Sequence, residues 1–79
     1  MDKHEFEQFV TEHGKDILRF CRMNAGSTER GNELCQDTMV KLLEKQKKLD
    51  AAQNIKSYAM QTAILLWKAR KIRRRNRHF

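Results

Sequence analysis

The 79-residue sequence contains no proline and only three glycines. β-Sandwiches and β-barrels need frequent turns, which these two residue types favour, so the composition argues against an all-β fold. No run of apolar residues approaches the roughly 18 that a membrane span requires. No apolar segment follows the charged N-terminus. We therefore expect neither a transmembrane helix nor a secretory signal, and we expect a cytoplasmic protein.

Side chains that catalyse reactions or bind metals are few and scattered. The histidines His4, His13 and His78 lie far apart, and Cys21 and Cys35 form no metal-binding or disulfide pattern. No glycine-rich phosphate loop is present. We therefore expect no enzyme, no cofactor, no metal and no small-molecule substrate. Both cysteines fall on apolar helix faces, which predicts buried free thiols in a reducing compartment.

Acidic residues are absent after Asp50, although the chain has 17 basic and 10 acidic residues and a net charge of +7. Residues 1–50 carry nine Lys or Arg and all ten acids, a net charge of −1. Residues 51–79 carry eight Lys or Arg and no acid, a net charge of +8. This division predicts a polyanionic partner for the C-terminal part and a different partner for the N-terminal part.

Apolar residues recur at spacings of three and four in three segments, which predicts amphipathic α-helices. The first helix is expected over residues 1–23, and the second over 28–48, capped by Ser27 or Thr28. A polar loop over 49–54 leads to the third helix, which is capped by Asn54 and continues into a basic tail over 55–79. The expected fold is all-α, a single small three-helix bundle over 1–79 with a basic C-terminal helix extension.

The third helix is apolar over more than one stripe, because Met60, Ile64, Leu65 and Trp67 widen its inner face. Such a helix is either sandwiched between two others or exposes an apolar patch. The residues expected to face the core are Phe6, Phe9, Val10, Ile17, Leu18, Phe20 and Cys21 in the first helix, Leu34, Cys35, Thr38, Met39, Leu42 and Leu43 in the second, and Ile55, Tyr58, Ala59, Thr62, Ala63, Leu66 and Ala69 in the third.

The end of the third helix is strongly basic, with seven Lys or Arg among the eleven residues 68–78. A cationic rod of this kind can lie against phosphates and release counterions, which predicts salt-sensitive nucleic-acid binding. A solvated tail and an anionic membrane surface are the alternatives. Tyr58 and Trp67 lie just upstream, where they either stack on unpaired bases or pack in the core.

Three segments in order resemble region 2 of bacterial RNA polymerase sigma factors of the sigma-70 family. Residues 33–42, Glu-Leu-Cys-Gln-Asp-Thr-Met-Val-Lys-Leu, are similar to its acidic, glutamine-containing helix. Residues 54–63, Asn-Ile-Lys-Ser-Tyr-Ala-Met-Gln-Thr-Ala, resemble the start of its promoter-melting helix, and residues 6–21 resemble its first helix. The small extracytoplasmic-function type is the subgroup with the greatest similarity.

The resemblance implies a transcription initiation factor domain that binds core RNA polymerase and melts the promoter minus-ten element. The second helix would dock on the clamp helices of the largest polymerase subunit through Glu33, Gln36, Asp37, Met39 and Lys41. The non-template single strand, with a flipped base near 49–53, would be contacted by Lys48, Asp50, Gln53, Asn54, Lys56, Gln61, Trp67, Lys68, Arg70, Lys71, Arg73, Arg74, Arg75 and Arg77. The resemblance further implies a place at the nucleoid during initiation and a possible anti-sigma protein as partner, and no membrane.

The sequence departs from the family pattern at four positions of the third helix. Tyr58 stands where the family usually has Trp, and Ala59 where it has Leu. Leu65 and Ala69 stand where the family often has a polar residue. The domain that reads the minus-thirty-five element has no counterpart in these 79 residues, so we expect either the N-terminal domain of a longer factor or a stand-alone region 2-like protein. Two alternatives therefore stay open: a sigma-like module that regulates a sigma factor or polymerase without binding promoters, and a generic basic nucleic-acid binder.

Overall fold

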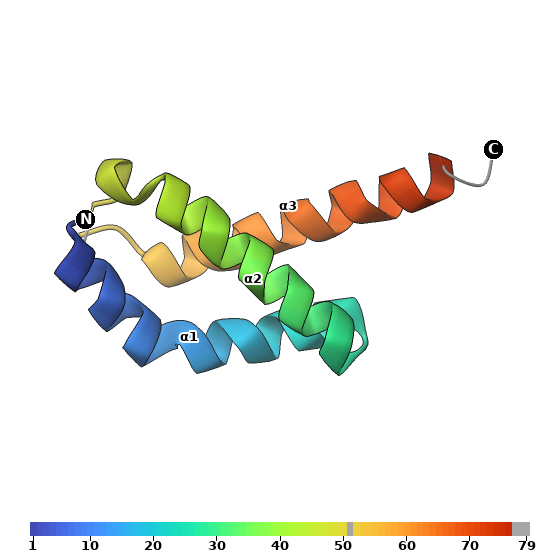
Figure 1. Ribbon diagram of the computed structural model, residues 1–79, viewed down its shortest axis with the longest axis horizontal. Coiled ribbons are helices and arrows are strands. Elements are labelled where there is room, and N and C mark those ends of the chain that lie inside the picture. Colours follow the sequence, from blue (N-terminus) through green and yellow to red (C-terminus); the bar gives the residue numbers. More distant parts are fainter. Residues whose placement is uncertain (51, 77–79) are drawn as a thin grey trace.

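The computed structural model describes residues 1–50 and 52–76, with side chains described as far as Lys71. Three helices, α1 (Lys3–Ala25), α2 (Thr28–Glu44) and α3 (Ile55–Asn76), make up nearly all of it, with a short 3₁₀ turn, η1 (Gln46–Lys48), after α2. Each helix contacts the other two, and α2 runs obliquely between α1 and α3 (Figure 1). The prediction of a small all-α helical bundle is confirmed.

Side-chain hydrogen bonds cap the starts of α2 and α3. The Ser27 hydroxyl accepts a hydrogen bond from the Arg30 backbone at 3.2 Å, and the Asn54 side chain accepts one from the Ser57 backbone at 3.1 Å. These bonds satisfy backbone N–H groups that have no partner inside the helix. Ser27 is therefore the cap of α2, and the prediction that Asn54 caps α3 is confirmed.

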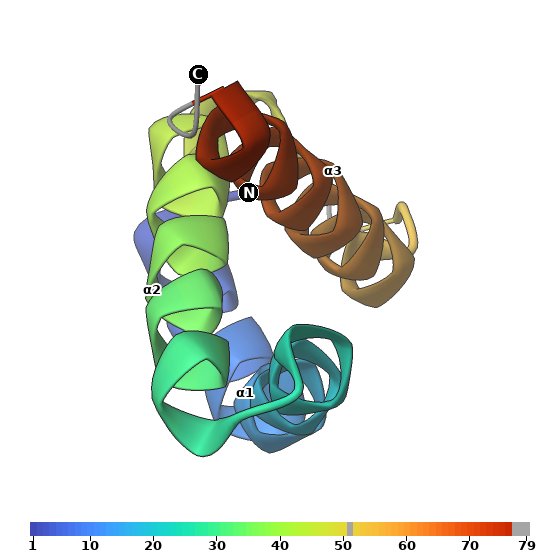
Figure 2. The ribbon, with the colours of Figure 1, turned by 90° about the vertical axis from the view of Figure 1, so that its right-hand side faces the viewer.

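The turn between α1 and α2 depends on two glycines. Gly26 ends α1 with φ of 74°, a left-handed conformation that residues with a Cβ rarely adopt. Gly31 lies where α2 crosses α1, and a Cβ added there would stand 2.5 Å from the Cα of Arg22. The two helices can therefore approach this closely only because position 31 has no side chain. Figure 2 shows this turn joining α1 to the start of α2.

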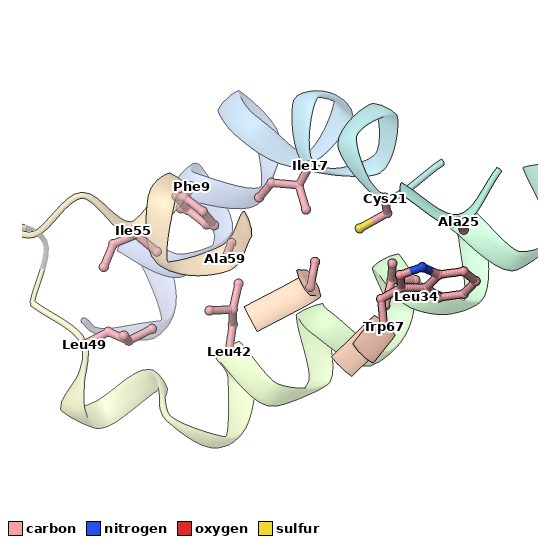
Figure 3. Close-up of a cluster of buried hydrophobic side chains, with 11 residues drawn as sticks. Phe9, Ile17, Cys21, Ala25, Leu34, Leu42, Leu49, Ile55, Ala59 and Trp67 are labelled. Atoms are coloured by element: carbon pink, nitrogen blue, oxygen red, sulfur yellow. The ribbon is translucent and has the colours of Figure 1, made fainter. Parts of the chain in front are cut away.

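The core is formed by side chains from all three helices that point toward one another (Figure 3). Thr38 is the one polar member among the described residues, and its hydroxyl donates a hydrogen bond to the Leu34 carbonyl at 2.8 Å. Its polar group is therefore satisfied within α2. The buried hydrophobic residues are Phe9, Ile17, Cys21, Ala25, Leu34, Leu42, Leu49, Ile55, Ala59, Ala63 and Trp67.

The structure corrects the expected buried faces at several positions. Val10, Leu43 and Ala69 are exposed, and Trp67 is buried at 8% exposure. The buried residues of α3 recur every four positions, from Ile55 through Ala59 and Ala63 to Trp67, which is the ridge that packs at a helix crossing. That spacing rotates the buried face away from Ala69 and toward Trp67.

Three helix boundaries also differ from the expectation. The first helix begins at Lys3, after its N-cap Asp2, and not at residue 1. The first helix continues to Ala25, two residues past the expected end, because Gly26 and not the preceding residues terminates it. The second α-helix ends at Glu44, and the remainder of the expected segment is the 3₁₀ turn η1. No helix in the described part of the chain is long and apolar enough to cross a membrane.

Candidate protein and nucleic-acid interfaces

The five α2 residues that the resemblance assigns to polymerase docking spread over the outer half of the helix. Glu33, Gln36 and Asp37 are spaced by three and four residues and are all exposed, so they share its outer face. Met39 lies on the flank toward α1, and Lys41 lies on the flank toward α3. Each residue turns the helix by about 100°, so Gln36 borders the α1 flank and Asp37 reaches Arg70 of α3 from the same exposed face.

An open groove of about 540 Å³ runs between α1 and α2. Met39 and Gln36 line it from α2 together with Val40, which is 52% exposed. Leu18 of α1, half-buried, lines the opposite wall. The sequence predicts Leu18 only as a core residue, because no feature of the sequence separates a core leucine from one at a groove wall. The groove offers a mainly apolar surface, with the polar side chains of Asn32 and Gln36 at its edge.

Cys35 also lines this groove, and Cys21 is buried behind it in the core. Both thiols are free, as predicted from their apolar positions. Burial raises the pKa of the Cys21 thiol to about 11 and also raises the pKa of the Cys35 thiol. Neither is therefore a reactive thiolate near neutral pH, and both behave as small apolar side chains.

A second recess, of about 250 Å³, lies between α2 and α3. It is bordered by Lys41 of α2, by Lys45, which is the C-cap of that helix, and by Tyr58 and Gln61 of α3. The Lys45 ammonium stands 6.0 Å from the centre of the Tyr58 ring, within cation–π range. Sequence reasoning missed Lys45, although its spacing of four from Lys41 places both lysines on one side of the helix end.

At the other end of the α2–α3 boundary, Arg70 forms an ion pair with Asp37. The Nη2 group of Arg70 donates a hydrogen bond to Oδ2 of Asp37. The Arg70 side chain is 24% exposed and that of Asp37 is 50% exposed. This contact joins a residue that the resemblance assigns to polymerase docking with one that it assigns to DNA.

The loop before α3 is held by its own polar side chains. Asp50 accepts a hydrogen bond from the Ala52 backbone at 3.0 Å, and the Gln53 backbone donates to the Asp50 carbonyl at 2.9 Å. Residues 53–56 border a recess of about 330 Å³, whose other wall is α1 with Glu12 and His13. The loop therefore presents a partly formed polar recess next to Gln53 and Asn54.

Lys56, the first cation of α3, is tied to α1. Its ammonium lies 3.0 Å from Oδ2 of Asp16, and both side chains are partly exposed. This hydrogen bond, and the positive charge of Lys56, hold the pKa of the Asp16 carboxyl below its ordinary value. The sequence expectation placed Lys56 on DNA and gave Asp16 no role.

The described basic residues near the end of α3 differ in their surroundings. Lys68 and Lys71 are exposed, and the Lys71 ammonium lies 5.7 Å from the centre of the Trp67 ring. The Trp67 ring is buried in the core, which leaves little of its surface for the predicted contact with DNA. A residue at this position is buried because the helix packs on every fourth residue.

The remaining residues expected on DNA lie in two groups. Lys48 of η1 and Gln61 of α3 are exposed. The α3 helix continues to Asn76, so it includes Arg73, Arg74 and Arg75, as predicted. The structure describes the backbone of these three residues and not their side chains. Arg77 lies outside the described residues. Figure 1 shows this end of α3 projecting beyond the other two helices.

Within the described residues no three His, Cys, Asp or Glu side chains converge in a way that could hold a metal ion. What the surface does offer is two kinds of recognition. The α1–α2 side has a mainly apolar groove edged by the amides of Asn32 and Gln36, which suits a protein partner. The α3 side has a recess bordered by Lys41 and Lys45 and, farther along the helix, the exposed Lys68 and Lys71, which suit a phosphate backbone.

Comparison with known proteins gives one match. The sequence model of the family described as Sigma-70 region 2 matches residues 9–78, which include parts of all three helices. Comparison with curated proteins and with solved structures gives no match.

Proposed function

We propose that this chain, which belongs to the sigma-70 region 2 family, docks on core RNA polymerase through α2 and binds the non-template strand of a promoter minus-ten element through residues 48–56 and α3. In general terms, the family's role is polymerase binding and promoter melting. The observation that carries the proposal is the extent of the family match, since residues 9–78 include both the docking helix and the basic helix. On this proposal the chain acts in the cytoplasm at the nucleoid.

The docking part of the proposal rests on the side of α2 that borders α1. Val40 and the nearby Leu43 are exposed large hydrophobic residues on a helix whose other apolar side chains are buried or half-buried. With the groove beside Met39, they form a small apolar centre, and Glu33 and Gln36 supply a polar rim. That arrangement matches the anatomy of a protein–protein interface.

The DNA part rests on charge that the rest of the protein does not neutralise. Lys48, Lys68 and Lys71 form no ion pair among the described side chains, and all three are exposed. The chain has no acidic residue after Asp50. A negatively charged backbone laid along α3 would therefore meet uncompensated positive charge, while residues 53–56 offer a recess for an extruded base.

Binding to purified bacterial core RNA polymerase tests the docking part. Val40→Lys places a charge in the proposed apolar centre, and we expect it to weaken binding by roughly tenfold or more. Met23→Lys is the matched control, because Met23 is also exposed (77%) but does not line the groove. Equal affinity of the two variants would remove this side of α2 from the interface.

One observation favours the alternative of a sigma-like interaction module that does not bind promoters. Leu65 is 67% exposed and Ala69 is exposed, so the outer ridge of α3 is apolar at two positions where the family often has polar side chains. The two functions differ in one measurement. A promoter-binding domain prefers the non-template minus-ten strand over a scrambled strand of equal length in the presence of polymerase, and an interaction module shows no preference.

A further inference from the structure

We propose that the Asp37–Arg70 ion pair couples the two binding surfaces, so that a cationic group of the polymerase that pairs with Asp37 releases the Arg70 guanidinium for the DNA backbone. This inference rests on the proposed function, which assigns α2 to the polymerase and α3 to DNA. It adds a competition between partners. Asp37 pairs either with Arg70 or with a cation of the polymerase, and Arg70 pairs either with Asp37 or with the DNA backbone. Binding at one surface therefore changes the other.

The geometry places this contact at the boundary between the two surfaces. Asp37 lies near the middle of α2 and Arg70 follows the buried Trp67 by less than one turn of α3. Because Trp67 is fixed in the core, Arg70 is held beside α2 and does not project freely with the end of the helix. The side chain of Arg70 is only 24% exposed, so most of its surface is covered when the pair is formed.

The charge pattern of α3 explains why Arg70 pairs with a residue of another helix. α3 contains no acidic residue, so its cations cannot be neutralised by the usual pairs three or four residues away on the same helix. Their counter-charges come from the other helices instead, as in Arg70 with Asp37 and Lys56 with Asp16. Of the two acids, Asp37 is the one on the proposed docking helix.

The consequence for binding follows from the chemistry of the two groups. A guanidinium that donates to a carboxylate contributes little net charge toward a phosphate, although its other N–H groups stay available. When a cation from a partner takes over Asp37, the full positive charge of Arg70 faces the DNA. Binding free energies are reciprocal, so DNA that captures Arg70 leaves Asp37 ready for the polymerase by the same factor.

The first test measures the affinity of the whole chain for a short fluorescent single-stranded DNA at several salt concentrations. Asp37→Asn breaks the pair, and Glu33→Gln removes one negative charge from the same helix at a residue with no described ion pair. We expect Asp37→Asn to bind roughly twofold to fivefold more tightly than Glu33→Gln, the range that corresponds to a partly exposed pair. The slope of log affinity against log salt should steepen by roughly 0.7, the value for one additional phosphate contact.

The same comparison in an Arg70→Gln background isolates the pair. Once Arg70 is absent, Asp37→Asn should have no more effect than Glu33→Gln, because both then change only the general charge of α2. Circular dichroism of each variant verifies that the helices are retained. Equal effects of the two α2 substitutions in the wild-type background would overturn the coupling while leaving the DNA function intact.

The second test measures the affinity of the chain for core RNA polymerase in the absence of DNA. Arg70→Gln frees Asp37 and should raise affinity for core RNA polymerase by the same roughly twofold to fivefold factor. Lys15→Gln, which removes an exposed cation of α1 with no described ion pair, is the matched control and should leave that affinity unchanged. Equal affinities of the two variants would overturn the proposal. A wild-type chain that binds neither polymerase nor DNA would overturn the proposed function, and the coupling with it.

Discussion

The two ends of α3 are stabilised in different ways. From Ile55 to Trp67 every fourth residue is buried against α1 and α2, and two of these residues are alanines, which let the helices approach closely. After Trp67 the described side chains are exposed or half-buried, and basic residues dominate the helix to its end. Like charges three and four residues apart repel one another, so this half is not stabilised by pairs along its own helix and depends on contacts such as Arg70 with Asp37.

The two ends of α3 thus differ in surroundings, although they belong to one continuous helix. The packed half fixes the position and direction of α3, and the basic half carries most of the positive charge of the helix. The junction is Trp67, whose buried ring ends the packed half and whose ring face is approached by the Lys71 ammonium at 5.7 Å. Substitutions in the first half should therefore change stability, and substitutions in the second half should change binding.

The largest expected effect is at the junction itself. Trp67→Ala removes a buried indole and should lower the free energy of unfolding by roughly 3–5 kcal/mol, which is measurable by denaturant titration. Leu65→Ala is the control on the same helix: Leu65 is exposed, so its loss should change stability by no more than about 0.5 kcal/mol. Similar losses for the two variants would show that the packed half does not end where we place it.

The second effect tests whether stability and binding separate. Gly31→Ala forces a Cβ against the Arg22 backbone and should destabilise the α1–α2 crossing by roughly 1–3 kcal/mol. Gly14→Ala meets only Val10 at an ordinary 3.7 Å and should gain up to about 1 kcal/mol, since alanine is the better helix former. Under conditions where both are folded, their DNA affinities should be equal. A difference in DNA affinity would show that the basic half senses the distant crossing.

The third effect lies in the basic half. Replacing Arg70, Arg73 and Arg74 together with Ala should weaken binding to single-stranded DNA by about tenfold at moderate salt and flatten its salt dependence. Replacing Lys15, Arg19 and Arg30 with Ala removes the same charge from exposed positions on α1 and α2. If this control flattened the salt dependence as much, the net charge of the chain and not the basic helix would set the affinity.

The smallest effect concerns the start of the packed half, where Lys56 pairs with Asp16. The pKa of Asp16 is lowered in the folded protein, so folding favours its ionised form. The stabilisation is complete above the ordinary Asp pKa, near 4, and is lost as the pH falls through the lowered folded value. Asp16→Asn should therefore be less stable than wild type at neutral pH and should approach it in acid. An unchanged difference across that range would exclude the pair as a source of stability.

Much of the fold follows from local patterns. The caps Ser27 and Asn54 satisfy backbone groups within three residues of themselves, and apolar spacing gives three helices close to their observed ranges. The errors lie where the buried face depends on the crossing between helices. Leu43 and Ala69 fit an isolated amphipathic helix as core residues, yet α2 and α3 turn them outward.

The candidate site was predictable in its residue types and less so in its arrangement. The basic character of α3 and the exposed acids of α2 are visible in the sequence, and the family resemblance gives them partners. The groove wall at Leu18, the role of Lys45 beside Tyr58 and the partner of Lys56 depend on which helices meet. Sequence spacing reaches only one turn along a helix, and these contacts join different helices.

By itself, the sequence determined the all-α architecture, the charge division at residue 50 and the family to which the chain belongs. These depend on composition and on interactions between near neighbours. The tertiary structure alone decided that Trp67 is buried, that Met39 borders α1 while Lys41 borders α3, and that Asp37 meets Arg70. A step of one residue rotates a helix face by about 100°, so these features depend on how the helices cross.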